Sequence, residues 1–218
     1  MHGYLSNKES FYFQTEYFSR YFRVIAIDIT GFGKSKMLSY PYCLDDYCDD
    51  VFKVLNALNI KKCHLIAHSF GGRIAVKIAS SCNLIDKLIL TGSAGLKPKR
   101  KISYYLKVFS YKAIKIFLNN EAKNKFGSKE LKSLSGNMRE SYYKIVNEHL
   151  DNLLRNIKAK TLIIYGQKDL ETPVYMAKRF NKGIKGSTLY IIKNAGHFCF
   201  IDKYNEFNII VNEFLRGQ

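Results

Sequence analysis

The chain has 218 residues, of which 35 are basic and 18 acidic, giving a formal net charge of +17 with 47% hydrophobic residues. Its length suits one domain with a sizeable core, and its apolar content, with 16 tyrosines and 15 phenylalanines, excludes a disordered chain. No run approaches the ~20 apolar residues of a membrane-spanning helix, and the polar start after Met1 does not resemble a secretory signal. We therefore expect a cytoplasmic protein without a membrane span.

Five apolar runs predict strands, at residues 22–29, 63–67, 88–91, 161–165 and 188–192. Runs that are apolar throughout, rather than alternating, are typical of strands covered by helices on both faces. Between them, apolar residues recur at helical spacing from Leu44 to Leu58 and again over 203–215. The alternation predicts an α/β fold, a mostly parallel sheet flanked by helices.

Residues 96–155 interrupt this alternation and are expected to form a small helical cap on a core made of 1–95 and 156–218. Residues 97–160 hold sixteen Lys and Arg against five Asp and Glu, so most of the net charge lies there. The segment is also rich in aromatic residues that could line an acyl pocket or pack the cap onto the core: Tyr104, Tyr105, Phe109, Tyr111, Phe117, Phe126, Tyr142 and Tyr143.

The basic charge admits nucleic acid, an anionic surface or an anionic substrate as partner. Lysine is abundant together with Asn, Ile, Tyr and Phe, which is the bias of an AT-rich coding sequence, and no nucleic-acid-binding motif is present. We expect no nucleic-acid partner. A basic surface-binding module is kept as a third hypothesis, which would require salt-sensitive binding.

The cysteines are odd in number and form no CxxC pair: Cys43, Cys48, Cys63, Cys82 and Cys199. This indicates reduced thiols and argues against a structural zinc site. We expect no metal and no cofactor. The oligomeric state is not predicted.

Ser69 is the strongest candidate for a catalytic residue. It follows the predicted strand at 63–67 and precedes a predicted helix, with Ala67 and Gly71 two residues before and after it. A nucleophilic serine on a sharp strand-to-helix turn requires small residues at both positions, and the amide of Phe70 can then bind a developing oxyanion.

With this turn the chain resembles the α/β-hydrolase family, in its capped, esterase-like branch of serine hydrolases. Tyr165-Gly-Gln-Lys-Asp169 looks like the family's acid turn, and Asn194-Ala-Gly-His197 looks like its histidine loop. The resemblance implies a triad of Ser69 as nucleophile, Asp169 as acid and His197 as base, in the family's order. Residues 28–35 (DITGFGKS) resemble its DxxGxGxS loop. His2-Gly3-Tyr4 resembles its oxyanion loop, with Tyr4 as second amide donor.

The resemblance implies a serine hydrolase that cleaves a small carboxylic ester or thioester through an acyl-enzyme. C–C bond hydrolases, aminopeptidases and acyltransferases of the same family remain open, as does a non-catalytic or truncated remnant. The resemblance thus implies a small ester-like molecule as the partner.

Other site interpretations fit less well. Residues 33–35 (GKS) end like a phosphate-binding loop but lack its first glycine, and Gly31-Phe-Gly33 lacks the third glycine of a dinucleotide site. His64, His68 and His149 are interpreted as structural, although His68 adjoins the nucleophile. Glu171 is the alternative acid should Asp169 point elsewhere.

The family's oxyanion loop follows an interior strand, whereas here it begins at residue 2. We therefore expect the chain to lack the first strands of the sheet and not to be the whole functional protein.

Overall fold

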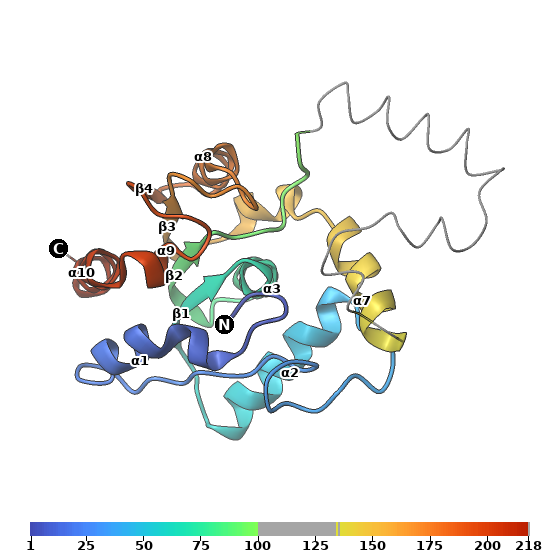
Figure 1. Ribbon diagram of the computed structural model, residues 1–218. Coiled ribbons are helices and arrows are strands. Elements are labelled where there is room, and N and C mark those ends of the chain that lie inside the picture. The colour runs from blue at the N-terminus through green and yellow to red at the C-terminus, as the bar shows by residue number, and fades with distance from the viewer. Residues whose placement is uncertain (100–133, 135, 218) are drawn as a thin grey trace.

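The computed structural model describes residues 1–99, 134 and 136–217, which form a parallel sheet between two layers of helices (Figure 1). The described elements are η1 (Lys8–Phe11), α1 (Tyr12–Phe18), α2 (Leu44–Ala57), β1 (Cys63–His68), α3 (Phe70–Ser81), β2 (Ile85–Thr91), α7 (Gly136–Asn147), η2 (Asp151–Asn156), β3 (Lys160–Gly166), α8 (Val174–Gly183), β4 (Thr188–Ile192), α9 (Cys199–Asp202) and α10 (Tyr204–Arg216).

The four strands pair in chain order, β1-β2-β3-β4, and every pair is parallel. The register places Thr91 opposite both His68 and Ile164, so the carboxyl ends of β1, β2 and β3 meet at one edge. Loops leaving that edge hold the candidate residues, as is usual in parallel sheets. The predicted α/β fold with a parallel sheet is confirmed.

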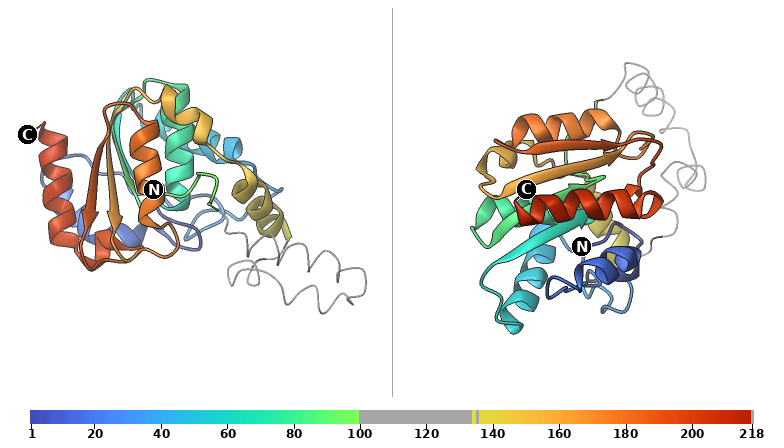
Figure 2. Two further views of the ribbon diagram at one scale, coloured as in Figure 1. Left: turned by 90° about the horizontal axis from the view of Figure 1, so that it is seen from above. Right: turned by 90° about the vertical axis from the view of Figure 1, so that its left-hand side faces the viewer.

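Each face of the sheet has its own apolar core, because successive side chains of a strand point to opposite faces. Leu88 and Leu90 of β2 join the core under α2, α3 and α8, whereas Ile89 joins Phe200 and Phe207 in the core under α1 and α10. Figure 2 shows α10 and α1 on one side of the sheet and α3 and α8 on the other. Helices on both faces account for the non-alternating strand sequences.

Helix α2 illustrates how local sequence positions an element. Its first-turn residue Asp46 accepts a hydrogen bond from the Cys43 N–H at 2.7 Å, and Leu44, Tyr47 and Val51 are buried on one face. The carboxylate satisfies an otherwise unpaired amide and complements the helix dipole. The predicted helix at 44–58 is confirmed.

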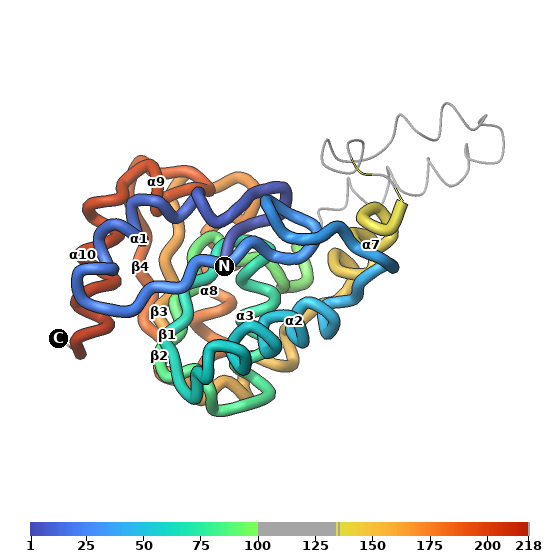
Figure 3. The backbone as a smooth tube through the Cα atoms, turned by 90° about the horizontal axis from the view of Figure 1, so that it is seen from below, coloured from blue at the N-terminus to red at the C-terminus, as the bar shows by residue number. Residues whose placement is uncertain are grey.

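The predicted strand at 22–29 is wrong. The segment is not a β-strand in the structure, although its sequence has strong β-propensity, and Val24 and Ile25 are exposed by 37% and 38%. Figure 3 follows it from the end of α1 toward the loop that precedes α2. A strand needs a neighbour for its ladder hydrogen bonds, and β1 does not supply one here.

Between β2 and β3, the described residues form α7 and η2 and contain no strand. Arg73 of α3 donates to the carbonyl oxygens of Ile145 and Glu148 at 2.8 Å each, which fastens the carboxyl end of α7 to the core. Of the predicted cap aromatics, Tyr142 and Tyr143 lie on α7. The others (Tyr104, Tyr105, Phe109, Tyr111, Phe117, Phe126) lie outside the described residues.

All five cysteines are free thiols. Within the described ranges, no helix is long and apolar enough to cross a bilayer.

Candidate active site

Ser69 occupies the turn between β1 and α3 in a left-handed backbone conformation, φ 49° and ψ −111°. Its N–H donates to Thr91 O, and its carbonyl accepts from the amides of Gly72 and Ala94. A non-glycine residue at such a φ is strained and persists only where its surroundings hold it. These three bonds hold the turn that the sequence predicted.

Gly71 shows why this turn needs a small residue after the serine. A Cβ at Gly71 would lie 2.7 Å from the carbonyl oxygens of both Met1 and His2. The Gly71 N–H donates to His2 O at 3.1 Å. The backbone of residues 1–2 therefore packs directly on the start of α3, beside Ser69.

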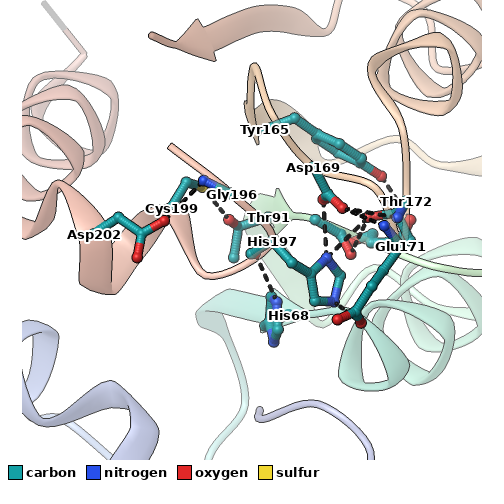
Figure 4. Close-up of polar contacts among 12 residues, drawn as sticks. His68, Thr91, Tyr165, Asp169, Glu171, Thr172, Gly196, His197, Cys199 and Asp202 are labelled. Atoms are coloured by element: carbon teal, nitrogen blue, oxygen red, sulfur yellow. Dashed lines mark hydrogen bonds and ion pairs between the residues drawn. The ribbon is translucent and has the colours of Figure 1, made fainter. Parts of the chain in front are cut away.

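His197 and Asp169 form a buried pair at the ends of β4 and β3. His197 Nδ1 lies 2.9 Å from Asp169 Oδ2, and the two side chains are 6% and 0% exposed (Figure 4). Burial alone raises the pKa of Asp169, but hydrogen bonds from His197 and Thr172 outweigh it and leave that pKa below its ordinary value. Asp169 is therefore a carboxylate at neutral pH, suited to orient the imidazole and to stabilise its protonated form.

The loops that carry this pair are bonded to each other through their backbones. Gln167 N–H donates to Ile192 O at 2.9 Å, and Lys168 N–H donates to Ala195 O at 2.8 Å. Gly166 lies so close to Gly196 O that any side chain at position 166 would overlap it. The approach of β3 to β4 thus fixes the separation of acid and base.

Two residues that sequence reasoning missed contact the pair. The Thr172 Oγ1 lies 2.7 Å from Asp169 Oδ2 and 3.0 Å from Gly92 O, and the Thr172 N–H donates to Asp169 Oδ1 at 2.8 Å. Gly92, at φ 48°, leaves room for the ring of His197, whose Nδ1 would lie 3.2 Å from a Cβ there. A glycine directly after the apolar strand at 88–91 was the available signal.

Glu171 does not occupy the acid position of the pair. Its Oε2 lies 3.2 Å from His197 Nε2, on the other side of the ring from Asp169, and its side chain is 66% exposed. His197 Nε2 faces Glu171 in this structure (Figure 4). Among the described residues, no hydrogen bond joins Ser69 to His197. Asp169, rather than the alternative Glu171, has the geometry of an orienting acid.

The loop at residues 2–4 lies beside Ser69. A Cβ at Gly3 would lie 3.3 Å from Ser69 Cβ, and the Tyr4 ring contacts the Phe70 ring at 5.4 Å between centroids. The buried His2 ring holds the loop, because Nδ1 contacts Gly3 O at 2.7 Å and Nε2 accepts from the Ile29 N–H at 2.9 Å. Both predicted oxyanion residues, Tyr4 and Phe70, therefore lie next to the candidate nucleophile.

The loop at 28–35 is closed by side chains. The Asp28 carboxylate accepts from the amides of Lys8 and Lys34, and Ser35 Oγ donates to Asp28 O at 2.5 Å. Gly33, at φ 55°, packs so tightly against this carboxylate that a Cβ would overlap it. Asp28, Gly33 and Ser35 thus stabilise the loop. The Asp28 carboxylate accepts from the Lys34 amide, a group that a phosphate-binding loop would leave free for an anion.

His68 is 1% exposed, and its Nε2 lies 3.1 Å from the carbonyl oxygen of His197. Burial and the nearby His197 lower its pKa to about 3, so the ring is neutral and donates from Nε2. This favours the structural interpretation. His64 contacts Asp86 at 3.6 Å, and the described residues contain no cluster of three metal-ligating side chains.

Comparisons with known proteins identify the family to which this fold belongs. The family model described as the alpha/beta hydrolase fold matches residues 1–204. The chain belongs to the α/β-hydrolase fold family. It is 30% identical to the AB hydrolase superfamily protein YisY of Bacillus subtilis, over 98% of this chain and 89% of that protein.

Two further members of the family carry more specific names. A 2-hydroxy-6-oxo-2,4-heptadienoate hydrolase of Pseudomonas putida is 26% identical over 92% of this chain and 80% of that protein. The solved esterase of Exiguobacterium antarcticum superposes with a TM-score of 0.78, at 22% identity over 99% of this chain and 90% of the other. The α/β-hydrolase relatives of this chain therefore include both C–C bond hydrolases and esterases.

Proposed function

We propose that this α/β-hydrolase is a serine hydrolase that cleaves small carboxylic esters or thioesters through an acyl-enzyme. The observation that carries the proposal is the buried Asp169–His197 pair at 2.9 Å, at the same sheet edge as Ser69 on its strained turn. A weak serine nucleophile becomes reactive only beside a base that a third group orients.

In the proposed reaction, substrate displaces Glu171 from His197 Nε2, which then accepts the Ser69 proton as Oγ attacks the acyl carbonyl. The developing oxyanion is stabilised by the amides of Tyr4 and Phe70. His197 returns the proton to the departing alcohol or thiol, and the same groups then direct water at the acyl-enzyme. Asp169 keeps the imidazole in the required tautomer throughout.

The test is labelling with a fluorophosphonate probe followed by identification of the modified residue. We expect labelling at Ser69, none in Ser69→Ala, and a fall in ester turnover of roughly a thousandfold or more in that variant. Ser80→Ala, on the same helix with its hydroxyl bonded to Lys77 O, is the matched control and should label normally. A folded protein that does not label, or that labels equally after Ser69→Ala, contradicts the proposal and favours the non-catalytic alternative.

C–C bond hydrolysis is the second candidate, favoured by the Pseudomonas putida relative. The substrate in that relative's name carries a carboxylate and a ketone. In this chain the exposed Glu171 already places a carboxylate at His197 Nε2, which disfavours an anionic substrate there. Turnover of 2-hydroxy-6-oxo-2,4-heptadienoate and of p-nitrophenyl acetate, compared on one enzyme preparation, separates the two. A kcat/KM for the dienoate above that for the ester assigns C–C hydrolysis.

A further inference from the structure

Two carboxylates lie against the imidazole of His197, one at each ring nitrogen. Asp169 Oδ2 lies 2.9 Å from Nδ1, and Glu171 Oε2 lies 3.2 Å from Nε2 (Figure 4). Asp169 orients the base in the proposed reaction. Glu171 takes no part in that chemistry, because substrate must displace it from Nε2, so its position at this nitrogen requires a different explanation.

Glu171 is held in place by the acid of the pair. The N–H groups of Glu171 and Thr172 both donate to Asp169 Oδ1, at 2.9 Å and 2.8 Å. The Glu171 side chain is nevertheless largely exposed, whereas those of Asp169 and His197 are buried. The backbone of residue 171 is therefore tied to the buried pair, while its carboxylate is accessible to a molecule that approaches His197.

The charges around His197 do not balance. A protonated His197 carries one positive charge against two carboxylates, and among the described residues neither carboxylate forms an ion pair with Lys or Arg. His68, whose ring packs against that of His197, is neutral, because burial and the nearby His197 lower its pKa to about 3. The surroundings of Nε2 therefore keep an excess of negative charge even when His197 is protonated.

The net charge of +17 on the whole chain does not cancel this local excess. At physiological ionic strength, interactions between exposed charges are largely screened beyond about 8 Å. The Glu171 carboxylate, by contrast, lies in contact with the nitrogen that exchanges protons in the proposed reaction. A cationic group of a bound molecule would meet this carboxylate first.

Building on the proposed serine hydrolase function, we propose that Glu171 is a specificity-determining residue that selects esters or thioesters whose leaving group carries an ammonium group. An ammonium group that pairs with Glu171 draws the carboxylate away from His197 Nε2. Binding of such a substrate thereby frees this nitrogen to accept the proton of Ser69. One ionic contact both selects the substrate and makes the base available.

The position of Nε2 assigns the charge to the leaving group rather than to the acyl group. This nitrogen returns the proton to the leaving oxygen or sulfur, which must lie about 3 Å from it. Glu171 Oε2 is at a similar distance from the same nitrogen, so it lies within about 6 Å of the leaving atom. An ammonium group two carbons away from the leaving atom fits this interval. The acyl group passes to Ser69 Oγ, and the leaving group departs with the proton from Nε2 and keeps its ammonium.

The test compares two thioesters of nearly the same shape, acetylthiocholine and its uncharged analogue 3,3-dimethylbutyl thioacetate. In the analogue a carbon atom replaces the quaternary nitrogen, so the charge is removed while the size is kept. Thiol release is measured for wild type, Ser69→Ala, Glu171→Gln and Glu171→Lys. Glu213→Gln, which removes an exposed carboxylate on α10, is the matched control.

We expect wild type to prefer acetylthiocholine over the analogue by about fivefold or more in kcat/KM, and Glu171→Gln to reduce this ratio to about twofold or less. Glu171→Lys should reverse the preference, and Glu213→Gln should retain the wild-type ratio. Turnover that depends on Ser69 but shows no preference, or a preference that Glu171→Gln retains, would overturn the assignment of Glu171 and leave the proposed hydrolase function in place.

A binding measurement decides the case in which neither thioester is hydrolysed at Ser69. Choline is titrated into folded Ser69→Ala protein while the ring signals of His197 are followed by NMR. We expect a saturable shift that Glu171→Gln abolishes and Glu213→Gln retains. No saturable shift, or an equal shift after Glu171→Gln, would overturn the cation site. A shift that depends on Glu171, in a protein that hydrolyses neither thioester, would support the cation site and contradict the proposed reaction.

Discussion

The acid–base half of the candidate site and its nucleophile half differ in how the chain holds them. Asp169 and His197 stand on loops joined by backbone hydrogen bonds between neighbouring strands, such as Lys168 N–H to Ala195 O. The loop at residues 2–4 beside Ser69 also has a backbone hydrogen bond, from Gly71 N–H to His2 O, but it depends in addition on the side chains of His2 and, through the adjoining loop at 28–35, of Asp28. The first half should tolerate substitution around it, whereas the second should be sensitive to single side chains.

The largest expected effect tests the acid–base half itself. Asp169→Asn should lower kcat by roughly a thousandfold or more, because an amide can hold the wrong tautomer of His197. The backbone bonds between the loops remain, so the free energy of unfolding should change far less than activity does. Ester kinetics with denaturant unfolding check both. Full activity in this variant would remove Asp169 from the triad.

His68 links the two halves, since it adjoins Ser69 and contacts His197 O. Its pKa is lowered from 6.5 to about 3, so the unfolded chain binds a proton in this range that the folded chain does not. Stability is therefore fully present above about pH 6.5 and falls, by up to about 1.4 kcal/mol per pH unit, as the pH drops toward 3.

Urea unfolding of wild type and His68→Gln between pH 6.5 and 4.5 measures this contribution. The variant should show a shallower loss of stability toward acid, because its amide does not titrate. Equal slopes in the two proteins would contradict the assignment to His68.

Gly33 tests whether side chains stabilise the nucleophile half. Gly33→Ala should destabilise the protein by about 1–3 kcal/mol, since it forces a side chain onto the Asp28 carboxylate at a positive φ. Gly186→Ala is the matched control, because Gly186 also has a positive φ but no atom near its added Cβ. A loss of stability no greater than that of the control would show that the loop is not braced as described.

The smallest expected effect sharpens the assignment of the acid. Glu171→Gln should change kcat/KM for the neutral p-nitrophenyl acetate by less than about threefold, because the carboxylate is largely exposed and lies at Nε2 rather than at the orienting Nδ1. Steady-state kinetics beside Asp169→Asn make the comparison. If Glu171→Gln proves as damaging as Asp169→Asn, the two carboxylates have exchanged roles.

The sequence predicts that Asp169 and His197 lie close together because the signals for that proximity are local. Asp169 and His197 each follow an apolar run that becomes a strand, and parallel strands bring their carboxyl ends to one edge. Thr172 and Gly92 contact Asp169 and His197 from other parts of the chain, and the spacing of residues in the sequence does not predict these contacts. The prediction of a strand at 22–29 is wrong because β-propensity is a local property, whereas a strand also requires a neighbouring strand.

The hydrogen bonds of Arg73 bear on which changes of sequence in α7 this protein can tolerate. The guanidinium donates to two main-chain carbonyls at the end of α7, those of Ile145 and Glu148. Any helix that terminates at the same place offers the same two oxygens, whatever residues it contains. The sequence of residues 136–148 can therefore vary while the helix that starts at the candidate nucleophile keeps these two hydrogen bonds.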